Sequence, residues 1–108
     1  MIEIMKRVVP RPFPTDPHVE SLKQLGQWVK AARTQAGLRL QDAALVLKVS
    51  VQTLVDIEAG RPSVTVGKLF AVTQGLGIDL FALPRGRRDL ARRELAELVP
   101  SPPSERGR

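Results

Sequence analysis

Apolar residues recur at spacings of three and four through the middle of the chain, which is the period of an amphipathic helix. The first such stripe predicts a helix from about Val19 that ends at Gly37. Its members are Leu22, Leu25, Val29, Ala32 and Ala36. Trp28 borders this stripe, where an aromatic side chain is either part of the core, the commoner case, or an anchor for a partner.

Three shorter helices are expected next, over residues 40–47, 51–59 and 66–75. Ser50 and Thr65 precede the second and third of these, and each hydroxyl can accept a hydrogen bond from an early helical amide. Gly60 and Gly77 follow them, as is common after a helix C-terminus. The positions expected to face inward are Ala43, Ala44, Leu47, Leu54, Ile57, Val66, Leu69, Phe70 and Thr73.

The apolar run from Ile78 to Leu83 lies between Gly77 and Pro84 and is too short for another helix, so it predicts a strand. A lone strand in a helical chain leaves unpaired backbone groups that attract another edge. The simplest partner is the same strand of a second subunit, which predicts a homodimer. The residues expected to form its interface are Ile78, Leu80, Phe81 and Leu83.

The chain divides into three parts by composition. Residues 1–18 contain four prolines and form an N-terminal arm with balanced charge, and residues 19–84 hold the helices and the strand. Residues 85–108 are rich in arginine, with a short helix expected over 89–98 and a disordered tail from Pro100 onward. The arginine cluster is either a solvated helix face, which is commoner, or an auxiliary phosphate or partner contact.

Composition narrows the classes of function. The 108 residues carry a net charge of +6, which favours a polyanionic partner. They include no Cys, no Tyr and one His, and the acidic residues never cluster, so we expect neither an enzyme nor a metal or cofactor site. No apolar run is long enough for a membrane span, and the absence of Cys fits a cytoplasmic protein.

Two short helices joined by a tight turn form the helix-turn-helix arrangement. The sequence from Ala31 to Leu80 resembles the lambda-repressor-like, XRE-type helix-turn-helix family, and the resemblance covers about residues 22–83. Its core signature is VSxxTLxxIExG, starting at Val49. The continuation LGIDLFALP is similar to the HipB-like antitoxin branch, in which a strand at this point pairs across a dimer.

The resemblance implies a mostly α fold, a lambda-repressor-like bundle of four to five helices with one short C-terminal strand paired across a dimer. It also implies that helix 51–59 reads the major groove of operator DNA with its N-terminal end leading. The residues expected to face bases are Val51, Gln52, Val55 and Asp56, with Thr53 beside them. The residues expected near phosphates are Arg39, Gln41, Ser50, Arg61 and Ser63. Arg33 and Glu58 match a structural ion pair of the family.

Three residues depart from the family pattern. Leu40 replaces a glutamine that grips the DNA backbone, although Gln41 can substitute from one position later, and Lys48 stands where the turn usually has glycine. Asp56 places a negative charge on the reading helix. The first hypothesis is therefore a DNA-binding repressor, the antitoxin of a HipA-like kinase toxin that autoregulates its operon. The alternative is a protein-interaction module whose DNA-reading face has decayed.

Overall fold

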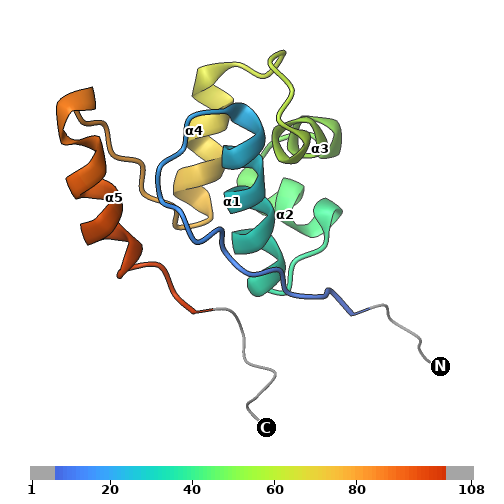
Figure 1. The fold of residues 1–108 in the computed structure, drawn as a ribbon. Helices are drawn as coiled ribbons and strands as arrows, with labels where there is room; N and C mark the ends of the chain where they lie inside the picture. Colours follow the sequence, from blue (N-terminus) through green and yellow to red (C-terminus); the bar gives the residue numbers. More distant parts are fainter. Residues whose placement is uncertain (1–6, 102–108) are drawn as a thin grey trace, which may run out of the picture.

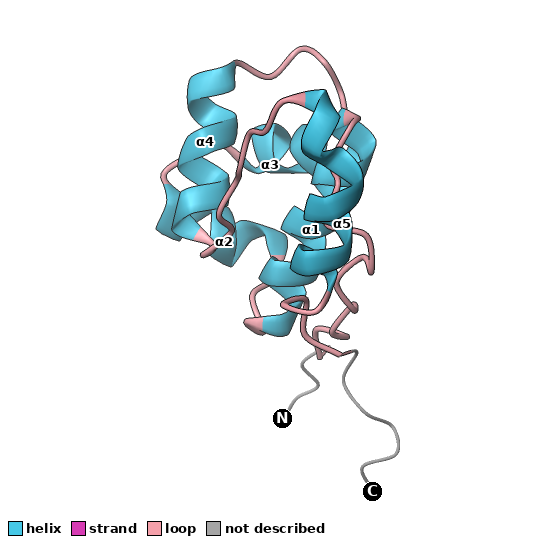
Figure 2. Ribbon diagram, turned by 60° about the vertical axis from the view of Figure 1, so that its left-hand side comes forward, coloured by secondary structure: helices cyan, strands magenta, loops and turns pink. Residues whose placement is uncertain are grey.

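The computed structural model describes residues 7–101, which form five α-helices and one 3₁₀ turn (Figure 1). The helices are α1 (Leu22–Gln35), α2 (Leu40–Leu47), α3 (Val51–Ala59), α4 (Val66–Gly75) and α5 (Arg88–Ala96), and the 3₁₀ turn η1 is Arg85–Arg87. None of these helices is long and apolar enough to cross a bilayer. Figure 2 shows helices and loops only in this part of the chain.

Side-chain caps determine where three helices begin. Ser50 accepts a hydrogen bond from the Thr53 amide and Thr65 accepts one from the Lys68 amide, so both predicted caps are confirmed. The bounds predicted for α2, α3 and α4 are confirmed as well. The first helix begins at Leu22 rather than near Val19, because Ser21 caps it by accepting from the Gln24 amide at 3.1 Å.

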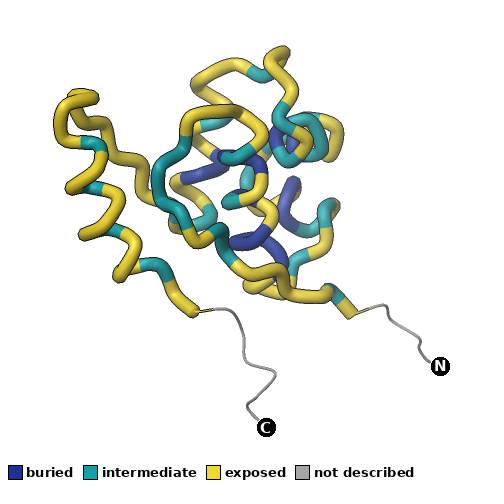
Figure 3. Tube along the Cα trace, in the orientation of Figure 1, coloured by how far each residue is buried: buried dark blue, intermediate teal, exposed yellow. Residues whose placement is uncertain are grey.

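The core lies where α1, α2, α3 and α4 meet. Figure 3 shows the buried segments in these four helices, whereas α5 carries none. The buried cluster consists of Val29, Ala43, Ala44, Leu54, Ile57 and Val72. Because two of its members are alanines on α2, neighbouring helices approach that helix closely.

Helix α1 approaches the backbone of α3 closely at Gly26. A Cβ atom added to Gly26 would lie 2.5 Å from the Ile57 carbonyl oxygen and 2.6 Å from that of Glu58. Both distances are shorter than any tolerated carbon–oxygen contact, and the obstructing atoms belong to the backbone. The C-terminal end of α3 therefore rests directly on the backbone of α1.

The apolar positions expected on α4 are partly wrong. Val66 and Phe70 are exposed, and the buried residues of this helix are Val72 and Thr73. Apolar residues occupy two faces of α4, since Leu69, Val72, Thr73 and Leu76 also follow a three-and-four spacing. Periodicity alone does not choose between two such faces. Leu22 and Ala36, the first and last members of the apolar stripe predicted for the first helix, are likewise exposed and lie outside the core.

Residues 76–84 connect α4 to η1, and the structure assigns no strand to residues 78–84. A strand is defined by its hydrogen bonds to a neighbouring strand, and this single copy offers the segment none. Pairing of Ile78–Leu83 across a dimer therefore remains a prediction.

The last helix differs slightly from the prediction of residues 89–98. It begins at Arg88 and ends at Ala96, after η1, whose Arg87 amide donates to the Pro84 carbonyl at 3.0 Å. Leu90 and Leu98 are exposed. Figure 1 shows α5 set off from the other helices, and Ala91, Leu95 and Leu98 line a cavity instead of the core.

The described part of the N-terminal arm lies along α1. The Arg11 amide donates to the Thr34 hydroxyl at 2.9 Å, and the Phe13 ring lies 5.2 Å from that of Trp28. Trp28 is thus half-buried beneath the arm. Asp16 pairs with Arg92 of α5. The His18 backbone amide and the Arg92 guanidinium both hold the pKa of Asp16 below its usual value.

The arm also reaches beyond the described residues. Residues 1–6 of the arm and residues 102–108 of the predicted disordered tail lie outside them. The boundaries predicted after residues 18 and 84 remain predictions.

The close approach at Gly26 gives the first prediction. Gly26→Ala should destabilise the protein by about 1–3 kcal/mol, since the added methyl group forces α1 away from α3. The matched change is Gly67→Ala on α4, where an added Cβ meets nothing within 4 Å. Alanine should there increase stability by up to about 1 kcal/mol through helix propensity. Urea unfolding of both variants measures the difference, and equal effects would contradict the proposed contact.

Candidate nucleic-acid interface

The turn between α2 and α3 is closed by a left-handed residue. Lys48 has φ 61° and ψ 42°, and the Val49 amide donates to the Ala44 carbonyl at 3.0 Å. A side chain in this conformation costs about 1–2 kcal/mol, which glycine would avoid. The turn therefore keeps the geometry that glycine usually provides, with a cationic side chain placed beside the start of α3.

The N-terminal end of α3 is both capped and accessible. The Ser50 hydroxyl accepts from the Thr53 amide at 2.9 Å and donates to the Thr53 hydroxyl at 2.9 Å. Val51 and Gln52 are exposed directly after this cap, whereas Thr53 and Val55 are half-buried. The first turn of α3 thus presents two side chains, one apolar and one amide, to the surroundings.

One turn later, three predicted site residues form a connected group. The Gln52 amide nitrogen donates to Asp56 Oδ1 at 2.9 Å, and an Arg61 Nη1 atom lies 3.6 Å from the same oxygen. Asp56 is largely covered, with a side chain 18% exposed. Its negative charge is therefore offset by Arg61, and the carboxylate fixes the orientation of the Gln52 amide because it can only accept. The four-residue spacing of Gln52 and Asp56 was the available sequence signal for this contact.

The other predicted phosphate-side residues come from different elements. Arg39 and Gln41 lie at the start of α2, and Ser63 lies in the loop before α4, all three exposed. Arg39 is paired with Asp42 at 3.0 Å, and this hydrogen bond lowers the pKa of Asp42 below its usual value. Sequence reasoning missed that pair. Within the described residues, no hydrogen bond or ion pair joins these three to the group around Asp56.

Arg33 on α1 and Glu58 on α3 form the most buried ion pair of the described residues. Arg33 Nε and Nη2 donate to the two carboxylate oxygens of Glu58 at 2.5 and 3.0 Å, and Nη1 donates to the Leu38 carbonyl at 2.8 Å. Their side chains are 8% and 9% exposed. This two-pronged geometry fixes the direction of α3 relative to α1.

The described residues offer no group of three His, Asp or Glu side chains that could hold a metal ion. The described residues instead bring together the capped helix α3, the tight turn that precedes it and basic side chains beside that turn.

Residues 29–83 match the model of the helix-turn-helix family HTH_3, which is just over half of the chain. The chain belongs to this helix-turn-helix family. A protein of Sinorhizobium fredii (strain NBRC 101917 / NGR234), named "Uncharacterized HTH-type transcriptional regulator y4mF", is 33% identical over 70 residues, which are 65% of this chain and 92% of that protein. The helix-turn-helix assignment made from the sequence is therefore confirmed.

Solved structures share the fold at lower identity. The chain is 20% identical to the protein described as "MDT Protein", with a TM-score of 0.57, and to a chain of "Structure of HipA-HipB-O2-O3 complex", also with a TM-score of 0.57. A third, "HipB-O4 20mer complex", gives 0.56 at the same identity. Each covers 63% of this chain and 96% of the other. At this identity the likeness establishes the helical fold, and membership of the HipB-like branch remains a prediction.

The buried and exposed ion pairs of this family domain allow a direct comparison. Glu58→Gln should destabilise the protein by about 3 kcal/mol, because Arg33 stays buried without its counter-charge. Asp42→Asn breaks the exposed Arg39 pair and should change stability far less. Chemical unfolding of the two variants tests this, and similar losses would show that Arg33 does not depend on Glu58.

Proposed function

We propose that this protein is a sequence-specific DNA-binding transcriptional repressor that inserts α3 into the major groove. The observation that carries the proposal is the exposed, Ser50-capped start of α3, with Val51 and Gln52 accessible, in a chain of the helix-turn-helix family. A helix of this kind reads base edges with the residues of its first turns. The relative from Sinorhizobium fredii, named as a transcriptional regulator, supports the same function.

Gln52 is the residue best prepared for reading a base. An amide that donates to adenine N7 and accepts from its N6 amino group makes the bidentate contact that identifies adenine in the major groove. Asp56 takes one amide hydrogen of Gln52 and leaves the second hydrogen and the amide oxygen available. The side chain is thus oriented before DNA arrives, and less conformational entropy is lost on binding.

Contacts to phosphates supply affinity without reading sequence. Arg61 is 60% exposed despite its contact with Asp56, and Arg39 and Lys48 are exposed as well. The chain carries a net charge of +6, which favours approach to DNA. These cations would hold the domain on the backbone while Gln52 and Val51 face the bases.

The finer proposal is that the protein is a homodimeric antitoxin of the HipB type that represses its own operon. Two copies would place their α3 helices roughly 34 Å apart, one turn of DNA, on a pseudo-palindromic operator. The partner would be a HipA-like kinase toxin. The fold shared with HipB, seen in structures described as complexes with HipA and with a 20mer, supports this reading.

Affinity for DNA should fall linearly with rising salt in a log–log plot, because bound cations displace counterions. Arg61→Ala should weaken operator and random-sequence binding alike and reduce the slope by about 1. Lys30→Ala removes an exposed cation from α1, far along the chain from the turn, and should leave the slope unchanged. Fluorescence anisotropy at several salt concentrations measures both. The absence of DNA binding at low salt would instead favour a protein-interaction module.

Gln52→Ala should cost about 1–3 kcal/mol on the preferred operator, selected from randomised duplexes, and leave random-sequence affinity nearly unchanged. Loss of a base contact lowers only the affinity for the preferred operator, whereas loss of a positive charge lowers the affinity for operator and random-sequence DNA alike. The matched variant is Gln74→Ala, which removes an exposed amide from α4 and should change neither affinity. If competition gel shifts show unchanged selectivity for Gln52→Ala, the base-reading role assigned to this residue is wrong.

A further inference from the structure

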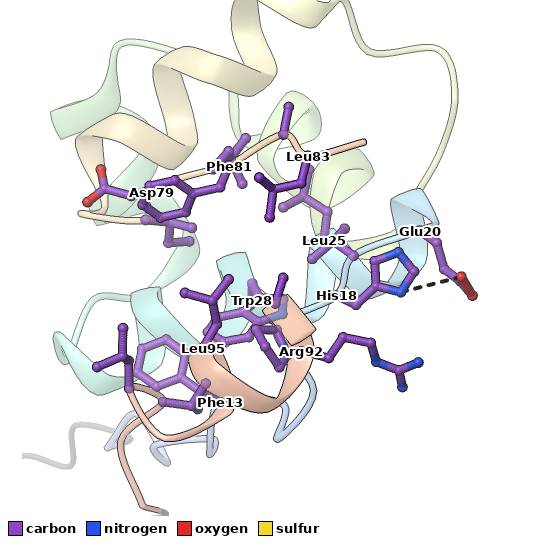
Figure 4. A pocket seen from close by; sticks show the side chains of 18 of the residues that line it. Phe13, His18, Glu20, Leu25, Trp28, Asp79, Phe81, Leu83, Arg92 and Leu95 are labelled. Carbon is purple, nitrogen blue, oxygen red and sulfur yellow. Dashed lines mark ion pairs between the residues drawn. The ribbon is translucent and has the colours of Figure 1, made fainter. Parts of the chain in front are cut away.

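A cavity of about 780 Å³ lies between α5 and the rest of the domain. Its walls come from three parts of the chain: the arm with α1, residues 76–84 after α4, and α5. Figure 4 shows Phe13 and Trp28 on the same side as Leu95, with Phe81 and Leu83 across an open centre. A concave, mostly apolar space of this size is typical of a site for a small organic molecule.

Helix α5 turns its less exposed face toward this cavity. Arg88, Ala91 and Leu95 are half-buried, and all three line the cavity. Their spacings of three and four residues place them on one face of the helix. No residue of α5 is buried, so this face borders the cavity instead of packing on the core. A ligand that displaces water from such an apolar surface gains binding free energy.

The arm and α5 are bridged on one side of the cavity by the Asp16–Arg92 pair. Arg92 Nε donates to Asp16 Oδ1 at 3.3 Å, and a second hydrogen bond runs from Nη2 to Oδ2. The same Asp16 Oδ1 atom accepts from the His18 amide at 2.9 Å. Arg92 is therefore committed to the arm and is not the cation of α5 that is available to a ligand.

Two other arginines line the cavity at the start of α5. Arg88 is the first residue of α5, and Arg85 lies one turn earlier in η1, which continues directly into α5. Neither forms an ion pair within residues 7–101. Leu95 and Leu98 line the cavity farther along the chain. The wall formed by η1 and α5 thus changes from cationic at its N-terminal end to apolar at its C-terminal end.

The acidic residues of the lining leave this cationic end uncompensated. Glu20 already has a neighbour, since one of its carboxylate oxygens lies 3.6 Å from His18 Nδ1, and Figure 4 shows this carboxylate directed away from the centre. Figure 4 also shows Asp79 on the opposite side of the cavity from Arg92. Arg88 precedes Arg92 by one helical turn, so it lies beyond Arg92 as seen from Leu95. An anionic group is the complement of that end of the cavity.

We propose that the cavity binds a small amphipathic carboxylate, a single anionic head on an apolar chain. The head pairs with Arg88 and Arg85, whose planar guanidinium groups suit a carboxylate. The chain lies between Trp28, Phe81 and Leu95. This inference goes beyond the proposed function and does not depend on DNA binding. Figure 1 shows α5 and α3 at opposite sides of the molecule, so an occupied cavity leaves α3 accessible.

Two probes with the same chain and opposite charge test the site. Decanoate carries a carboxylate, and decyltrimethylammonium carries a positive charge. Trp28 is the single tryptophan and lines the cavity, so its emission reports occupancy. Decanoate should shift this emission to shorter wavelength with a dissociation constant at least about 10-fold below that of the ammonium compound, because only the carboxylate can pair with Arg88.

Substitution of the cation separates the head-group contact from the shape of the cavity. Arg88→Gln should raise the dissociation constant of decanoate about 10-fold and leave that of decyltrimethylammonium within about twofold. The matched control is Arg87→Gln, because Arg87 carries the same charge one position away, is exposed and does not line the cavity. This control should bind decanoate like the wild type.

A second pair of variants tests the apolar end. Leu95→Gln should weaken both probes, since Leu95 lines the cavity, whereas Leu90→Gln should weaken neither, since Leu90 is exposed and outside the lining. Helix α5 adds no buried residue to the core, so all four variants should keep the wild-type midpoint of urea unfolding. A changed probe affinity then reports the cavity and not the folding of the domain.

Three results would overturn the inference. The first is no response of Trp28 to decanoate, and the second is equal affinity for the two probes with no effect of Arg88→Gln, which would show apolar adsorption only. The third is a decanoate affinity that falls as sedimentation velocity shows a dimer forming, which would make a second copy the occupant. Operator binding is measured separately on the same samples. Its absence would refute the proposed function and leave the carboxylate site standing.

Discussion

The fixed contact between α1 and α3 is the constraint on which the rest of the domain depends. Gly26 lets the backbone of α1 touch the carbonyls at the end of α3, and the Arg33–Glu58 pair locks the same two helices by directional hydrogen bonds. Van der Waals contact at Gly26 sets the distance between α1 and α3, and the Arg33–Glu58 pair sets the rotation of α3 relative to α1. A helix that reads a groove has to be held in both respects, because its side chains reach base edges only from one docking geometry.

Sequence patterns were sufficient for elements whose ends carry local chemistry. The starts of α3 and α4 follow from Ser50 and Thr65, whose hydroxyls bind helical amides whatever the rest of the fold does. The orientation of α4 did not follow, since this helix has apolar residues on two faces and tertiary packing decided between them. Val66 and Phe70 therefore remain outside the core although their spacing suits it.

The candidate site shows the same division. The exposure of Val51 and Gln52 was predictable from the cap and the helical period, whereas Val55 and Asp56, which were also expected to face bases, are half-buried. The bond from Gln52 to Asp56 and the docking of the arm on α1 depend on side-chain conformations and on contacts between residues far apart in sequence, which a linear pattern does not specify. The cavity beside α5 has no sequence signature at all, because a space between elements is determined by how those elements are held apart.

The contact between Asp56 and Arg61 has a consequence for how tightly the protein holds DNA of any sequence. In the free protein Arg61 already has an anionic neighbour, so a phosphate would have to compete with a carboxylate instead of meeting an uncommitted cation. Exchanging the Asp56 carboxylate for a phosphate contributes less binding free energy than forming an ion pair with a cation that has no partner. Genomic DNA presents a vast excess of wrong sites, and a protein that gains little from each of them spends less time away from its target. A carboxylate on the helix proposed to read DNA can thereby favour selectivity over affinity.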